Sequence, residues 1–83
     1  MATNRPEIVA QQMVLKMIHI RIEKGLSVNK LAWMSGVSAS AITFIENGTH
    51  SPTLKTFLRI ANALKLDVAR LYREADKAVP SDK

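Results

Sequence analysis

The feature that most constrains the fold is a helix break bounded by two capping residues, in the segment SVNKLAWMSGVSASAITFIENG at residues 27–48. Gly36 can adopt the positive φ that ends one helix, and Ser38 can cap the next. Ser27 is an equivalent cap for the first of the two helices. Apolar residues recur so that both helices bury one face inside a tight corner: Leu31, Ala32, Val37, Ile42 and Ile45. The outer face of the second helix is thereby left open.

Comparable start and stop signals divide the rest of the chain into helices. Pro6 and Glu7 favour a helix start and Gly25 its end, while Thr53 and Asp67 are caps for two later helices. We expect helices over residues 6–24, 28–35, 39–47, 54–64 and 68–77, with no strand. The sequence therefore predicts an all-α, compact five-helix bundle, with a single domain over residues 1–78 and a frayed C-terminal tail over residues 79–83.

Two sets of apolar residues are candidates for an interface between two copies of the chain. A chain of 83 residues buries only about 60% of its unfolded surface, so its stability margin is small and dimerisation is expected. The first helix has one apolar stripe for the core and a second beside it, which includes Ile18 and Ile22. The last helix has a short apolar edge formed by Val68, Leu71 and Tyr72.

Charge points to a polyanionic partner and composition argues against catalysis. The net charge is +5, and residues 1–65 hold 8 basic against 3 acidic residues, which accounts for the whole excess.

There is no cysteine, and His19 and His50 are isolated, so we expect no metal site, no cofactor and no catalytic residue. The longest apolar runs fall short of the roughly 20 residues that cross a bilayer, and no signal peptide is visible, so we expect a cytoplasmic protein.

The motifs Leu31-Ala32, 36–38 (GVS) and 45–48 (IENG) stand at the mutual spacing of a known family. With Arg21, Pro52 and the apolar positions of the fourth helix, they make the chain resemble the phage-repressor and Cro-like (XRE-type) helix-turn-helix family. The resemblance covers about residues 13–72. It implies a lambda-repressor-like DNA-binding domain that binds double-stranded operator DNA as a homodimer and regulates transcription.

The resemblance also supports an ion pair between Arg21 and Glu46. Arg21 lies on the core side of the first helix, and either charge alone would be expensive to bury, whereas a hydrogen-bonded pair is tolerable. The matching arginine and glutamate of the family bond to each other. The alternative is two independent surface charges.

The family grips the DNA backbone with helix starts and with the loop after its third helix. At the matching positions stand Ser27, Val28, Asn29, Lys30, Ser38, Thr49, His50 and Lys55. For the polar residues among these, the alternative is a cap or a solvated side chain, and Ser27 and Ser38 are expected to be caps. Base reading would fall to the outer face of the third helix, at Ala39, Ser40, Thr43, Phe44 and Asn47.

This outer face departs from richer versions of the family. It has no arginine or glutamine, so bidentate pairing with guanine or adenine is left to Asn47. Ala39 and Phe44 suit thymine methyl groups, and Ser40 and Thr43 offer single hydrogen bonds. We therefore expect modest direct readout, supplemented by DNA shape.

Two further departures raise structural questions. Trp33, Met34 and Phe44 stand where polar residues are usual, which indicates either a second protein partner or packing beneath the long first helix. Lys65 stands where the family often has glycine, so the turn there is expected to differ.

The sequence thus predicts a sequence-specific double-stranded DNA-binding transcriptional regulator of repressor type, acting as a homodimer on a palindromic operator. The alternative is a protein-interaction module of the same fold, such as an antitoxin, with weak base readout. Repressors, activators, antitoxins and restriction-modification controllers share this domain, and the sequence does not choose among them.

Overall fold

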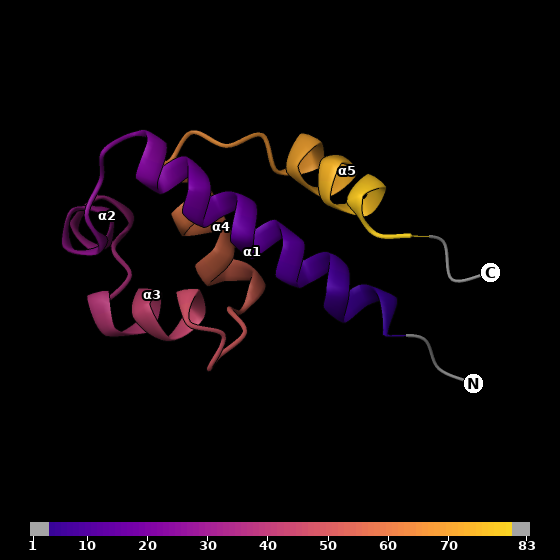
Figure 1. The fold of residues 1–83 in the computed structure, drawn as a ribbon. Helices are drawn as coiled ribbons and strands as arrows, with labels where there is room; N and C mark the ends of the chain where they lie inside the picture. The colour runs from indigo at the N-terminus through magenta and orange to yellow at the C-terminus, as the bar shows by residue number, and fades with distance from the viewer. Residues whose placement is uncertain (1–3, 81–83) are drawn as a thin grey trace.

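A computed structural model describes residues 4–80, and this part of the chain is built from five helices without a strand (Figure 1). They are α1 (Arg5–Glu23), α2 (Val28–Ser35), α3 (Ala39–Glu46), α4 (Leu54–Ala63) and α5 (Val68–Ala78). The predicted all-α class is confirmed, and every helix end lies within one residue of the prediction. No helix among residues 4–80 is long and apolar enough to cross a membrane.

Four of the helices begin at a side-chain cap. In each case the capping oxygen accepts the backbone N–H three residues later, which satisfies one of the unpaired donors of a helix start. The caps are Ser27, Ser38, Thr53 and Asp67, at 3.0 to 3.1 Å from the donor nitrogen. The local sequence signals are therefore sufficient to set these four starts.

Lys65 occupies a left-handed turn that glycine makes elsewhere in the chain. Its φ is +58°, close to the +69° of Gly25. The same hydrogen bond closes both turns, from Leu66 N to the carbonyl oxygen of Ala61 at 2.9 Å and from Leu26 N to the carbonyl oxygen of Arg21 at 3.1 Å. The expectation of a different turn is therefore wrong, because the turn is kept and the lysine carries the backbone strain of about 1 to 2 kcal/mol.

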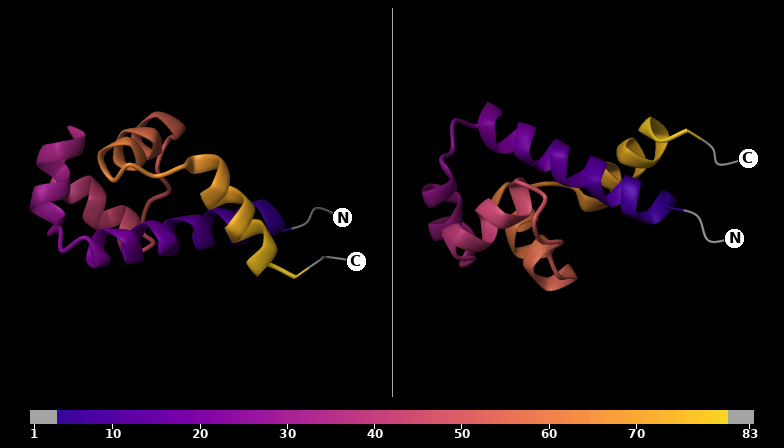
Figure 2. Two further views of the ribbon diagram at one scale, coloured as in Figure 1. Left: turned by 90° about the horizontal axis from the view of Figure 1, so that it is seen from above. Right: turned by 60° about the horizontal axis from the view of Figure 1, so that its bottom comes forward.

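The main core lies where α1, α2, α3 and α4 meet, with the start of α5 at its edge (Figure 2). Its largest fully buried side chains are those of Met17, Leu31, Ile42, Ile60 and Leu64. α1 packs against α5 and α3, and α2 packs against α3 and α4. Because α3 is held from two sides by other helices, its position is fixed by the core.

A second, smaller core joins the start of α1 to the end of α5. It consists of Val9, Ala75 and Val79, with Met13 packed against it. Arg5 closes this end of the molecule, because its Nη2 donates to Asp76 Oδ1 at 2.6 Å. Val79 is only 8% exposed, so the tail expected to fray from residue 79 is packed at that position. Residues 81–83 of that tail lie outside the described residues.

Candidate nucleic-acid interface

The turn between α2 and α3 sets the direction in which α3 is presented. Gly36 has a φ of +73°, and its N–H donates to the carbonyl oxygen of Ala32 at 3.0 Å. Ser38 then starts α3 by accepting the N–H of Ala41 at 3.1 Å. The inner side of α3 is anchored by Ile42, which has no exposed surface. The opposite side of α3 must therefore face outward.

The structure places the predicted base-reading residues on this outward side. Ser40, Thr43, Phe44 and Asn47 are exposed, and Ala39 is half-buried. α3 lies at the edge of the molecule, with no other helix beyond it in Figure 1. A short, exposed helix face of this kind is the part of a protein that can enter the major groove of DNA.

The loop after α3 is tied back to the helix end. The carbonyl oxygen of Phe44 accepts the N–H groups of Thr49 and His50, at 2.9 and 3.1 Å. Asn47 Oδ1 also accepts the Thr49 N–H, at 2.9 Å. The His50 ring packs edge-on against the Phe44 ring, with centroids 5.0 Å apart. Bidentate pairing of Asn47 with adenine would thus have to share an oxygen that already accepts a hydrogen bond.

Val28 differs from the other residues that were predicted to contact the DNA backbone. Its side chain is half-buried and packs against the main core, so only its backbone N–H at the start of α2 could face a phosphate. The remaining side chains are exposed: Ser27, Asn29, Lys30, Ser38, Thr49, His50 and Lys55. Lys30 Nζ lies 4.7 Å from the centre of the Trp33 ring, in a cation-π arrangement.

The electrostatic balance around α3 is one-sided. Glu46 is the single acidic residue between positions 24 and 66, a segment that also contains Lys30, Lys55 and Arg59. Its carboxylate forms an ion pair with Arg21 of α1, in which Nε donates to Oε2 at 2.7 Å and Nη2 donates to Oε1 at 2.9 Å. The segment from α2 to α4 therefore exposes positive charge to solvent, and it has no exposed carboxylate to offset that charge.

The Arg21 and Glu46 side chains are shielded from water as well as paired. Each is 14% exposed, and Arg21 Nη1 also donates to the carbonyl oxygen of Leu26 at 2.7 Å. The pair joins α1 to the end of α3 on the side away from the outward face. It therefore positions α3 and leaves the exposed residues of that helix available.

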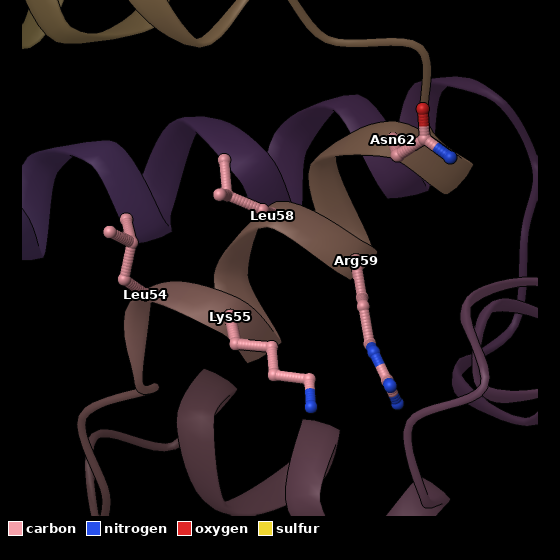
Figure 3. A pocket seen from close by; sticks show the side chains of 5 residues that line it. All are labelled: Leu54, Lys55, Leu58, Arg59 and Asn62. Carbon is pink, nitrogen blue, oxygen red and sulfur yellow. The ribbon is translucent and has the colours of Figure 1, made fainter.

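Arg59 is a basic residue of this surface that the sequence reasoning left out. It stands one turn after Lys55 on α4, and the two side chains extend to the same side of the helix, away from Leu58 (Figure 3). Together with Leu54, Leu58 and Asn62 they line an open groove of about 470 Å³. Neither cation has an ion-pair partner within residues 4–80. The i, i+4 spacing of the two charges was the signal that could have found Arg59.

The surplus apolar residues of this surface are solvent-exposed. Trp33 is 78%, Phe44 41% and Met34 40% exposed, so α1 does not cover Trp33 as the packing alternative required. These three residues stay available for a partner.

The prediction that Val68 and Leu71 of α5 belong to a dimer interface is wrong. Leu71 is only 3% exposed, and Val68 packs against the main core, so both stabilise the single chain. Tyr72 and Ile22 are 50% and 59% exposed, and Ile18 is half-buried. A helical apolar pattern gives the spacing of a face but does not say whether that face meets the chain's own core or a second copy.

Comparison with known proteins identifies related chains. A helix-turn-helix family model matches residues 18–71. The HTH-type transcriptional repressor RghR of Bacillus subtilis (strain 168) is 44% identical over 57 residues, which are 68% of this chain and 42% of that protein. The chain thus spans about two fifths of the length of this curated relative. No solved structure matches the chain.

Proposed function

Since this chain belongs to the helix-turn-helix family of phage-repressor and Cro-like proteins, we propose that it is a sequence-specific regulator of transcription. In this proposal it binds double-stranded DNA as a homodimer on a palindromic operator. The observation that carries the proposal is the outward face of α3 and the positive charge around it. Glu46, the single acidic residue between positions 24 and 66, is neutralised by its ion pair with Arg21. Such a surface attracts phosphates and offers a helix of a size that the major groove admits.

Phosphate contacts would supply most of the affinity. The starts of α2 and α3 present backbone N–H groups and the positive ends of helix dipoles, and capping by Ser27 and Ser38 leaves N–H groups of the first turn open. Lys30, Lys55 and Arg59 add exposed positive charge beside them. These contacts fix the position of the protein on the duplex and carry no sequence information themselves.

Base reading would be modest in this proposal. Ser40 and Thr43 each offer a hydroxyl, and the Phe44 ring offers an apolar contact to a thymine methyl group. No side chain on the face offers the bidentate pairing of arginine with guanine. We therefore propose that the shape and deformability of the site contribute to specificity at positions the protein does not touch.

A homodimer would carry two α3 helices to successive major-groove turns. Half-sites on one face of B-DNA are about 34 Å apart, which is why a two-fold protein matches a palindromic site. The direction of regulation is proposed by analogy with the Bacillus subtilis relative, which is named a transcriptional repressor.

The test is a selection of duplexes from a random pool, followed by affinity measurements at several salt concentrations. A palindromic consensus is expected, with a negative slope of log affinity against log salt of about 0.9 per neutralised phosphate. Lys55→Gln and Arg59→Gln are each expected to reduce the magnitude of this slope by about 1, because each variant removes one phosphate contact. Lys77→Gln, an exposed cation on α5, is the matched control and should leave the slope unchanged. Failure to enrich any duplex, with affinity insensitive to salt, would contradict the proposal.

A second candidate function is a protein-interaction module, which the exposure of Trp33, Met34 and Phe44 favours. Large exposed apolar side chains that join into one patch are typical of protein interfaces. The two functions differ in one measurement: Thr43→Ala and Lys55→Gln should weaken DNA binding, whereas a protein partner held by apolar contacts should be lost on Trp33→Ala and retained at high salt.

A further inference from the structure

α1 continues well beyond the part of the chain that the family model matches. The match begins at residue 18, while α1 starts at Arg5 and α5 runs on from residue 71 to Ala78. The extension is folded, because Val9, Ala75 and Val79 form its own small core and Arg5 bonds to Asp76. One side of this added helix is covered by α5, which raises the question of what its other side meets.

The uncovered side of α1 carries three large apolar residues at intervals of seven. Ile8, Leu15 and Ile22 are 40%, 49% and 59% exposed. A helix turns by about 100° per residue, so residues seven apart drift by only about 20° and all three lie within about 40° of one another. By the same rotation they lie on the side of the helix away from Val9 and Met17, which face the two cores.

No charged residue lies on this side of α1. The same rotation places the five charged residues of the helix on the flanks of the apolar line or on the core side. We call the uncovered face the α1 stripe, which consists of Ile8, Gln11, Gln12, Leu15, Ile18, His19 and Ile22. A heptad-spaced face without charge is the pattern with which one helix packs along another.

We propose that the α1 stripe is the surface through which two copies of this chain associate, with their α1 helices antiparallel and Leu15 on the two-fold axis. The stripe is symmetric about that residue, since Ile8 of one copy then lies at the level of Ile22 of the other. Gln12 lies at the level of Ile18 and beside His19. A second copy therefore brings Ile8 against Ile22 and Leu15 against Leu15 along about 21 Å of helix, with no charged residue inside the stripe.

Electrostatics favours the antiparallel arrangement over the parallel one. Two antiparallel helices place the positive end of each dipole beside the negative end of the other. Glu23, in the last turn of α1, then lies at the level of the N-terminal turn of the second copy, where a carboxylate is favourable. This inference rests on the homodimer of the proposed function and names its surface, and its test is read without DNA.

Cysteine substitution tests the geometry directly, because the chain has no cysteine of its own. Leu15→Cys is expected to form a disulfide-linked dimer under mild oxidation. Ile8→Cys alone is not, since its two copies would stand about 21 Å apart, but mixed with Ile22→Cys it should cross-link. Leu54→Cys, at a position 72% exposed on α4, is the control and should stay unlinked. Efficient self-linkage of Ile8→Cys, with none of Leu15→Cys, would overturn the antiparallel pairing.

Sedimentation equilibrium tests the association itself. The unmodified chain is expected to dimerise, and Leu15→Glu should weaken dimerisation by roughly 100-fold, because it would bring two unpaired carboxylates together on the axis. Leu54→Glu is the matched control and should dimerise as before. Circular dichroism checks that both variants stay folded, as expected at exposed positions. A chain that is monomeric at tens of micromolar, or a Leu15→Glu variant that dimerises normally, would overturn the proposal even if salt-sensitive DNA binding were present.

Discussion

Removal of the Glu46 carboxylate is expected to destabilise the domain by about 3 kcal/mol. Glu46→Ala would break the two hydrogen bonds of 2.7 and 2.9 Å to Arg21 and leave that cation 14% exposed with one remaining bond, to the Leu26 carbonyl oxygen. Loss of one partner of a buried pair costs about 3 to 5 kcal/mol, chiefly because the other charge stays buried. The remaining bond and the partial exposure of Arg21 place the expected loss at the lower end of that range.

Thermal and urea unfolding followed by circular dichroism measure this loss. For a domain of this size about 3 kcal/mol corresponds to a fall in Tm of roughly 12 to 24 °C. Glu74→Ala is the matched control, because the Arg70–Glu74 pair is 72% and 47% exposed and is worth less than about 0.5 kcal/mol. The double variant Arg21→Met with Glu46→Leu should recover most of the stability, since no unpaired charge is then buried.

Equal small losses in the free energy of unfolding for Glu46→Ala and Glu74→Ala would contradict this prediction. A double variant less stable than Glu46→Ala alone would contradict it as well. In either case the stability of the domain would not depend on shielding a paired charge between α1 and α3.

Three further substitutions test separate features of the fold by the same unfolding measurements. Lys65→Gly should stabilise the domain by about 1 kcal/mol by relieving the positive φ of +58°; a neutral or destabilising result would contradict the strained turn. Ser38→Ala should cost about 1 kcal/mol through loss of the α3 cap, and an unchanged Tm would show that the cap is dispensable. Val79→Ala should cost about 1.5 kcal/mol, for two buried carbons in the second core, whereas a frayed tail predicts no change.

The sequence predicted what local signals determine. Caps at Ser27 and Ser38, with glycine at position 36, mark the helix ends and the corner, because capping and positive φ are properties of a few neighbouring residues. The proximity of Arg21 and Glu46 followed from the cost of burying either charge alone, together with the family pattern. These signals were enough for the fold and for the outward direction of α3.

The remaining features depend on contacts between distant parts of the chain. Val79 was assigned to a frayed tail because its partner Val9 lies 70 positions away, and no local pattern announces that contact. Leu71 was assigned to a dimer edge because amphipathic spacing cannot tell a core from an interface. Arg59 is different, because it was passed over although its i, i+4 spacing from Lys55 on one helix is a local signal.

The most direct test of the central claim is a map of backbone amide chemical shifts as the selected duplex is added to the labelled protein. If the outward face of α3 enters the groove, the largest changes will fall on residues 39–50 and at the start of α2, with smaller ones at Lys55 and Arg59. Changes confined to α1 and α5, with residues 39–50 unmoved, would contradict the claim that α3 is the DNA-reading element.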